Sequence, residues 1–176
     1  MTDFVDPSTP AAWGSPRSKE IIWFDPITAA ATGAALSGIE HLQRMGRGEL
    51  PPPPIAAHFN MRLVEVSVGE VSFTCVPDES AYNPIGLVHG GLVCTLLDSV
   101  LGCAVQSTLP AGVGYTSIEL KVNYLRPVRG DTGELRARGW VVKPGRRVAF
   151  ADGDVRDADG KIVATASGSC LVMTPP

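Results

Sequence analysis

The chain has 176 residues, of which 44% are hydrophobic, and its formal net charge is −3. This size and composition predict one domain of ordinary size with a packed core and exclude a disordered chain. The slightly acidic balance argues against a general nucleic-acid binder, which requires basic patches.

The four cysteines, at positions 75, 94, 103 and 170, form no CxxC pair. Neither a zinc site nor a disulfide framework is therefore predicted, and we interpret the cysteines as small buried hydrophobic residues. The N-terminus lacks the basic and apolar regions of a signal peptide, and the longest apolar run, residues 92–105, is too short and too polar to span a bilayer. We expect a cytoplasmic protein with no membrane partner and no metal site.

Residues 1–27 contain four prolines and mixed charges, which predicts an irregular, loosely held arm. Trp13 and Trp23 suggest that parts of this arm dock on the rest of the protein. Hydrophobic residues then recur every three or four positions over residues 28–46, as in an amphipathic helix.

A run of four prolines, residues 51–54, predicts a stiff extended break after this helix. We therefore divide the chain into an N-terminal arm and helix, residues 1–54, and a main domain, residues 55–176.

The main domain is predicted to contain two strands, one long helix and four further strands in that order. Alternating hydrophobic residues indicate strands, and Gly, Pro and Asp clusters indicate the turns between them. An apolar helix is expected from Gly90 to Ser107, after a loop over residues 77–88. The predicted strands cover residues 61–68, 70–76, 114–125, 133–143, 146–156 and 161–173. This order predicts an α+β domain with an antiparallel sheet and one central helix.

Asp98 lies in the middle of the apolar helix. A carboxylate in such a run is costly to bury, and its proton affinity is expected to rise. The neighbours Leu97, Val100 and Leu101 argue against plain exposure. Asp98 is thus a candidate base or nucleophile, and the alternative is a helix acid that meets solvent or caps a neighbour.

Gly90 and Gly91 open this helix directly after His89. The first N–H groups of a helix have no intrahelical partner and favour negative charge, so these glycines are candidates for stabilising an oxyanion. The alternative is that they only permit close packing. His89 is either a scaffold for the loop or a proton-transfer group, and Asn83 is either part of the site or an ordinary turn residue.

The segment from residue 83 to residue 127 resembles the hotdog-fold acyl-CoA thioesterases, and most closely their PaaI-like branch. The motif consists of Asn83, Gly86, His89-Gly90-Gly91, Asp98 and the strand Ser117–Pro127. The turn at residues 143–147 and the closing strand also fit, so the resemblance covers residues 55–174. Residues 1–50 lie outside it.

The resemblance implies a hotdog fold, in which an antiparallel sheet wraps around one long helix. It also implies a homodimer joined edge to edge, often a homotetramer, with active sites at the dimer interface. By this resemblance, Gly90 and Gly91 of this chain would donate their N–H groups to the thioester oxygen. Asn83 and His89 would support the loop and the carbonyl. Asp98 would activate water or attack the acyl carbon. Either Ser117 or its neighbour Thr116 would place the water, and we favour Ser117.

The helix geometry independently predicts that the site is shared. Gly90 and Asp98 are eight residues apart on one helix, which corresponds to about 12 Å. A carbonyl bound at Gly90 therefore lies beyond the reach of Asp98 of the same chain. If both groups act on one substrate, two antiparallel helices from a two-fold dimer must form the site.

The expected function is hydrolysis of acyl-CoA thioesters to a free acid and coenzyme A, with no cofactor. Basic residues at strand ends are candidates for binding the phosphates of coenzyme A, and the alternative is that they are solvated turn charges. These residues are Arg126, Lys143, Arg146 and Arg147. Two other functions remain open: a non-catalytic acyl-CoA-binding or sensor domain, and a hotdog dehydratase or hydratase. The sequence leaves the acyl group undetermined among aryl, short and medium groups.

Overall fold

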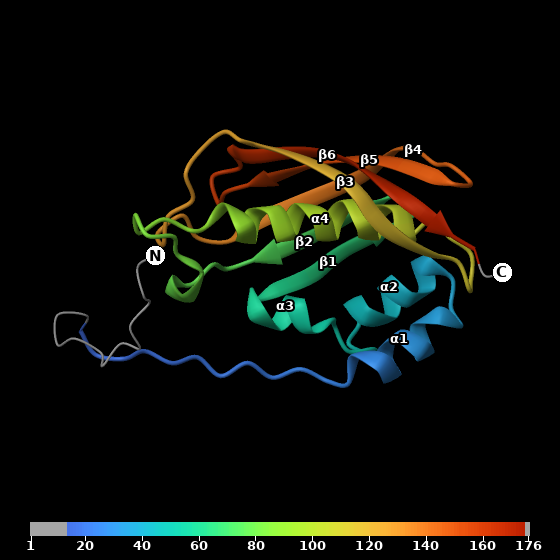
Figure 1. Cartoon of the computed structure of the whole chain (residues 1–176), viewed down its shortest axis with the longest axis horizontal. Coiled ribbons are helices and arrows are strands. Elements are labelled where there is room, and N and C mark those ends of the chain that lie inside the picture. The colour runs from blue at the N-terminus through green and yellow to red at the C-terminus, as the bar shows by residue number, and fades with distance from the viewer. Residues whose placement is uncertain (1–13, 175–176) are drawn as a thin grey trace, which may run out of the picture.

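The computed structural model describes residues 14–174 and places one long helix at its centre. This helix, α4 (Gly90–Gln106), lies between a curved antiparallel sheet on one side and three shorter helices on the other (Figure 1). The shorter helices are α1 (Pro26–Ala34), α2 (Gly38–Gly46) and α3 (Pro54–His58). The predicted architecture, an antiparallel sheet wrapped around one long helix, is confirmed.

The sheet has six strands in the order β1-β2-β4-β5-β6-β3, so that β1 and β3 form its edges. All six predicted strands are present, and their ends lie within two residues of the predicted ones. The strands are β1 (Met61–Ser67), β2 (Glu70–Cys75), β3 (Gly114–Tyr124), β4 (Leu135–Lys143), β5 (Val148–Arg156) and β6 (Ile162–Met173).

Helix α4 packs its buried side chains against the sheet and lies at the centre of the core. Its backbone approaches the strands closely at Gly139 of β4, where an added Cβ would lie 2.4 Å from the carbonyl oxygen of Val100. A side chain at this position would therefore push the helix off the sheet. The buried side chains of the helix include Leu92, Val93, Leu96, Leu97, Val100, Leu101, Ala104 and Val105.

The prediction of one continuous helix over residues 28–46 is wrong, because the chain breaks it into α1 and α2. The side chain of Ser37 caps α2 by accepting a hydrogen bond from the N–H of Glu40 at 3.4 Å. The N–H of Gly38 then donates to the carbonyl of Leu109 at 2.9 Å. Hydrophobic spacing did not reveal this break because it continues on both sides of the cap.

The proline run is extended as predicted, but its last member starts a short helix that the sequence analysis missed. Pro54 takes the first helical position of α3, where a missing N–H is tolerated. The boundary predicted between residues 54 and 55 therefore falls inside α3. A single turn of 3₁₀ helix, Glu79–Ala81, also interrupts the predicted loop over residues 77–88.

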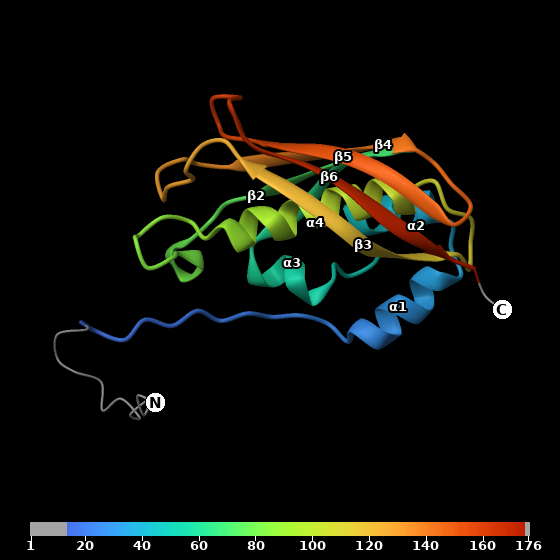
Figure 2. The same cartoon turned by 45° about the horizontal axis from the view of Figure 1, so that its top comes forward.

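Residues 14–25 run without regular structure along the side of α3 (Figure 2). Trp23 stacks on His58, with ring centroids 6.0 Å apart, which supports the predicted docking of the arm. Trp13 lies outside the described residues. Every helix within residues 14–174 is too short or too polar to cross a lipid bilayer.

Candidate active site

The loop that leads into α4 is shaped by Asn83. Its side-chain oxygen accepts hydrogen bonds from the N–H groups of Ile85 at 3.1 Å and Leu87 at 3.0 Å. Gly86, between them, has a φ of +77°, a left-handed conformation that favours glycine. Asn83 therefore supports the loop through its side chain, and its part in a site stays a prediction.

His89 forms the N-terminal cap of α4. Its Nδ1 accepts a hydrogen bond from the N–H of Gly91 at 2.8 Å. A ring nitrogen that accepts carries no proton, so the neutral imidazole holds its proton on Nε2. An added Cβ at Gly91 would lie 2.8 Å from Nδ1, so the cap requires glycine at this position.

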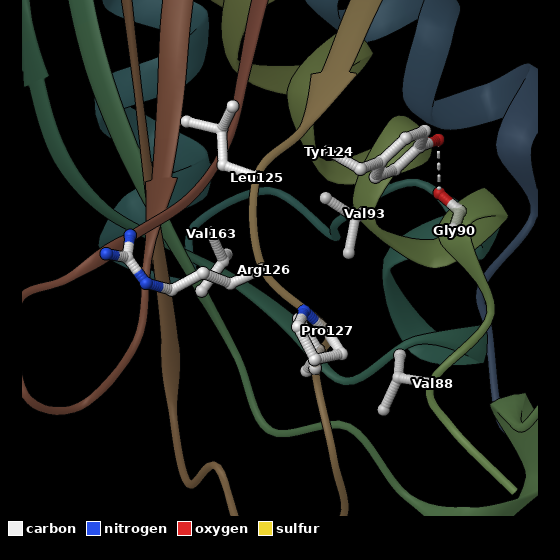
Figure 3. Close-up of a pocket in the computed structure, with 9 residues that line it drawn as sticks. Val88, Gly90, Val93, Tyr124, Leu125, Arg126, Pro127 and Val163 are labelled. Atoms are coloured by element: carbon white, nitrogen blue, oxygen red, sulfur yellow. Dashed lines mark hydrogen bonds between the residues drawn. The ribbon is translucent and has the colours of Figure 1, made fainter.

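Gly90 is the first residue of α4, and its N–H has no hydrogen-bond acceptor within residues 14–174. The carbonyl of Gly90 accepts a hydrogen bond from the Tyr124 hydroxyl at 2.9 Å, which fixes the orientation of the Gly90–Gly91 peptide (Figure 3). The two glycines thus differ: the N–H of Gly91 is bound by His89, whereas that of Gly90 is available to a ligand.

A pocket of about 310 Å³ adjoins Gly90. Its walls are mostly apolar and include Val88, Val93 and Pro127 (Figure 3). Arg126 also lines it, but its guanidinium points away from Gly90 and donates to the carbonyl of Ile162 at 2.7 Å. This pocket can hold an apolar ligand segment beside the free amide.

Asp98 lies two turns further along α4 and pairs with β3. The Ser117 hydroxyl donates a hydrogen bond to Oδ1 of Asp98 at 2.7 Å. Thr116 is adjacent in the strand, and its side chain faces the other way. The structure therefore brings Ser117, the favoured of the two residues, to the carboxylate.

The expectation that Asp98 is shielded from solvent within its own chain is wrong, because Asp98 is exposed. The hydrophobic neighbours Leu97 and Val100 turn toward the sheet, and the helical period carries Asp98 to the opposite face. Gly91 and Asp98 are exposed on that face, with Cys94 half-buried between them.

The two parts of the site remain apart in one chain. Gly90 and Asp98 lie on the same helix, eight residues or about 12 Å apart along its axis. Asp98 is bound by Ser117 of β3. This strand forms an edge of the sheet, and its outer backbone groups have no strand partner there. The structure therefore places a free amide and a hydrogen-bonded carboxylate at two separate points of one helix.

The four basic residues expected to bind coenzyme A do not form one cluster in this chain. Arg126 lies beside Gly90 at the N-terminal end of α4. Arg146 lines a depression together with Leu109 and Pro110, which follow the C-terminal end of α4. Lys143, the last residue of β4, and Arg147 lie at the same turn between β4 and β5 as Arg146. The 17-residue helix separates the two groups by about 25 Å.

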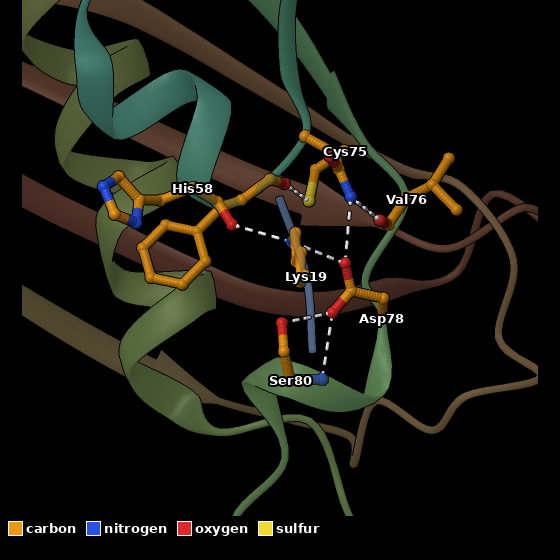
Figure 4. A network of polar contacts seen from close by, with 8 residues as sticks. Lys19, His58, Cys75, Val76, Asp78 and Ser80 are labelled. Carbon is orange, nitrogen blue, oxygen red and sulfur yellow. Dashed lines mark hydrogen bonds and ion pairs between the residues drawn. The ribbon is translucent and has the colours of Figure 1, made fainter. Parts of the chain in front are cut away.

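A polar network ties the loop to residues 14–25 (Figure 4). The Lys19 ammonium donates to the His58 carbonyl at 3.1 Å and to a carboxylate oxygen of Asp78 at 2.6 Å. The other oxygen of Asp78 accepts the N–H of Ser80 at 2.9 Å. Hydrogen bonds from Lys19 and Ser80 lower the pKa of Asp78 to about 2. The network therefore holds the start of the loop that carries Asn83 and His89.

Tyr124 is a site residue that the sequence analysis missed, and a β-bulge explains why. Strict alternation along β3 would place Tyr124 on the face opposite Ser117. The register of β3 shifts between Ser117 and Glu119, and beyond this bulge Val122 packs against the core. Tyr124 consequently reaches α4, as Ser117 does before the bulge.

Comparison with known proteins identifies relatives of this chain. Residues 85–164 match the family model described as the thioesterase superfamily. Acyl-coenzyme A thioesterase 13 of Homo sapiens is 32% identical over 104 residues, which cover 58% of this chain and 72% of the relative. A curated relative from Halobacterium salinarum is 42% identical over 50% of this chain and 62% of the relative. One from Caenorhabditis elegans is 39% identical over 57% of this chain and 59% of the relative. This chain therefore spans less than two thirds of the length of either relative.

Solved structures are similar over most of the described chain. A phenylacetic acid degradation-related protein of Ralstonia eutropha is 33% identical, with a TM-score of 0.68 over 74% of this chain and 98% of that chain. A Streptococcus mutans protein bound to acetyl CoA is 28% identical, with a TM-score of 0.60 over 65% and 90%. The PaaI protein of E. coli shares the fold at 20% identity, with a TM-score of 0.67 over 78% and 96%.

Proposed function

Because this chain belongs to the PaaI-like thioesterases of the hotdog superfamily, we propose that it hydrolyses acyl-CoA thioesters to a free acid and coenzyme A. The observation that carries this proposal is the presence on one long helix of a free amide, at Gly90, and a carboxylate, Asp98, that accepts a hydrogen bond from Ser117 of β3. A human relative named as an acyl-coenzyme A thioesterase and a Streptococcus mutans structure bound to acetyl CoA support the choice of substrate.

The amide end of α4 would bind the thioester oxygen. Attack on the acyl carbon places negative charge on that oxygen, and the N–H of Gly90, at the positive end of the helix dipole, is oriented in advance to stabilise it. The Nε2–H of His89 is a second available donor at this end. One such donor typically lowers the barrier by about 2.7–4 kcal/mol.

Asp98 would supply the base or the nucleophile. As a base, it takes a proton from water while the water oxygen bonds to the acyl carbon, and the C–S bond then breaks to release the thiol of coenzyme A after protonation. As a nucleophile, its carboxylate oxygen attacks the acyl carbon and the C–S bond breaks, so that the coenzyme A thiolate leaves and takes a proton from solvent; water then cleaves the mixed anhydride to the free acid and restores the carboxylate. In both routes the Ser117 hydroxyl holds the carboxylate in position through the 2.7 Å hydrogen bond.

The complete site would form between two copies of the chain. Strand β3 is an 11-residue edge strand, and unpaired edges are templates for pairing with a second chain. Two β3 strands joined antiparallel about a two-fold axis would run the two α4 helices in opposite directions. Gly90 of one protomer would then lie near Asp98 of its partner, and the pocket beside Gly90 would take the pantetheine end of the substrate.

A hydrolysis screen with free-thiol detection tests the reaction itself. Phenylacetyl-, benzoyl- and straight-chain acyl-CoA should release thiol and free acid with the protein as prepared, and chelators should not change the rate. Binding without thiol release would instead indicate a sensor domain. If a 3-hydroxyacyl-CoA is added to the series, its conversion to an enoyl-CoA with loss of water and no thiol release would indicate a dehydratase or hydratase.

Mixing two inactive variants tests whether the site is shared. Asp98→Asn removes the carboxylate, and Gly90→Pro removes the amide. A mixed dimer of the two retains one intact site, so random mixing should restore about a quarter of the wild-type activity. No recovery in dimers shown to have exchanged subunits would mean that each site lies within a single chain.

A further inference from the structure

We propose that the cavity between the N-terminal helices and the C-terminal half of α4 binds the acyl group, and that residues 26–54 determine which acyl groups fit. The cavity has a volume of about 250 Å³. It is lined by side chains of α1, α2, prolines 51–54, the last turns of α4 and Tyr115 of β3. This inference rests on the proposed hydrolysis of acyl-CoA.

The cavity begins one helical turn beyond the catalytic carboxylate. Gly102 follows Asp98 by four residues, about 6 Å along α4, and Cys103 next to it lines the cavity. Tyr115 precedes Ser117 by two residues, so both side chains project from the same face of β3. Ser117 contacts Asp98, and the Tyr115 ring packs over Gly102, where an added Cβ would lie 2.7 Å from the tyrosine hydroxyl.

The walls of the cavity suit an uncharged apolar group. Leu42 and Met45 of α2 and the proline rings provide apolar surface. Of its polar groups, the side-chain nitrogen of Gln106 lies 3.1 Å from Nδ1 of His41, so these two bind each other. A charged acyl terminus, such as that of a dicarboxylic acid, would find no counter-charge among the side chains that line this cavity.

The remaining polar groups of the cavity are neutral. Burial, with a smaller contribution from the charge of Asp98, raises the pKa of Cys103 to about 12. Burial also raises the pKa of Tyr115 well above its ordinary value, with Cys103 and Asp98 among the further causes. Both groups therefore stay protonated at neutral pH and add no charge to the cavity. The effect of Asp98 on both pKa values shows that the cavity lies near the catalytic carboxylate.

The size and stiffness of the walls limit the acyl group to short and medium length. Ligand pockets for drug-sized molecules occupy about 300–1,000 Å³, and this cavity lies below that range. Part of its wall is the proline run 51–54, whose rings fix the backbone. These wall residues lie outside the family match over residues 85–164, so selectivity would come from a part of the chain that the match does not cover.

Substitutions that fill or enlarge the cavity test this assignment. Ala29→Phe places a ring on the wall formed by α1, and Ala31→Phe is its matched control, exposed on the same helix and outside the lining. The ratio of kcat/KM for octanoyl-CoA to that for acetyl-CoA should fall at least about tenfold in Ala29→Phe and remain at the wild-type value in Ala31→Phe, since one methylene in an apolar pocket changes rates about 10–200-fold. Met45→Ala should raise the ratio of dodecanoyl- to octanoyl-CoA turnover.

Equal chain-length profiles for the wild type, Ala29→Phe and Met45→Ala would overturn the assignment while leaving the hydrolase function intact. If the wild-type protein hydrolyses no thioester of the series, the proposed function fails instead. Calorimetric dissociation constants for the same acyl-CoA series then test the cavity alone. The cavity is confirmed if Ala29→Phe weakens octanoyl-CoA binding relative to acetyl-CoA and Ala31→Phe does not, and refuted if the two variants bind alike.

Discussion

The two ends of α4 differ in how they are built. At the N-terminal end, the loop and first turn are held by directed hydrogen bonds from Asn83, His89 and Tyr124, and one backbone amide is left free. At the C-terminal end, α1, α2 and the proline run enclose a mostly apolar cavity beside the helix. Apart from Asn83, the residues of the first end lie within the matched residues 85–164, and the covering at the second end lies outside them.

This difference suggests a division between reaction and selectivity. Hydrogen bonds fix positions and charges, which every thioester hydrolysis needs in the same form. Apolar walls fix size and shape, which differ from one acyl group to another. Changes at the amide and carboxylate should therefore lower turnover for all acyl groups alike, whereas changes at the apolar end should alter the ranking of substrates.

The largest loss is expected from Asp98→Asn. The amide side chain keeps the size and one acceptor oxygen for Ser117 but cannot accept a proton from water or attack the acyl carbon. We expect kcat to fall by about 10²–10⁴-fold, and equally for acetyl-, octanoyl- and phenylacetyl-CoA. Steady-state kinetics with free-thiol detection measure this effect.

The matched control for Asp98→Asn is Asp131→Asn, which makes the same change in an exposed turn and should retain full activity. An Asp98→Asn protein with wild-type turnover would remove this residue from the mechanism. A loss confined to one acyl group would contradict the division between the two ends of α4.

A smaller uniform loss is expected when the amide of Gly90 is removed. Proline has no N–H but fits the first position of a helix, and the extended backbone of His89, with φ of −63° and ψ of 135°, is compatible with a following proline. Gly90→Pro should lower kcat about 10²–10³-fold relative to Gly90→Ala.

Gly90→Ala is the required control because it adds a Cβ but keeps the N–H. In either variant the Cβ would lie about 3.1 Å from the Tyr124 ring, so both share any effect of crowding. The difference between them isolates the donor. Equal kcat in the two variants, with equal circular dichroism spectra, would show that the Gly90 amide does not stabilise the transition state.

Sequence patterns predicted the hydrogen-bonded end better than the packed end. The spacing of Asn83, His89, Gly90 and Asp98 is local, and the residues act through their own loop and helix. The exposure of Asp98 was misjudged, because the helical period turns it away from the hydrophobic neighbours that precede and follow it. The role of Tyr124 was hidden by the bulge in β3, which reverses the faces of the strand.

The packed end depends on contacts between distant segments, which sequence periodicity does not contain. His41 was given no role from sequence, yet it lies 3.1 Å from Gln106 in the cavity wall. The break between α1 and α2 lets α2 pack against α4. It arises from one cap and one contact with the chain after α4. The partner of Lys19 is likewise 59 residues away.

The smallest effect is expected at the ion pair that holds the loop to residues 14–25. Hydrogen bonds from Lys19 and Ser80 lower the pKa of Asp78 from 3.8 to about 2 in the folded protein. A carboxylate with a lowered pKa stabilises the folded state above its unfolded pKa, and that contribution is lost as the pH falls toward the folded value. The Asp78 side chain is 37% exposed, so solvent and salt screen the pair, and we expect about 0.2–1 kcal/mol.

Asp78→Asn should therefore lower the free energy of unfolding at pH 7 by this amount, and the difference from wild type should disappear as the pH falls from 4 to 2. Urea denaturation at each pH measures it. The control is Asp159→Asn, which removes the ion pair with Lys161. Asp159 is 73% exposed, so its substitution should change the free energy of unfolding less than Asp78→Asn does. A difference for Asp78→Asn that is the same at pH 7 and pH 2 would mean that its charge does not hold the loop. The loop at the N-terminal end of α4 would then depend on packing, as the C-terminal end does.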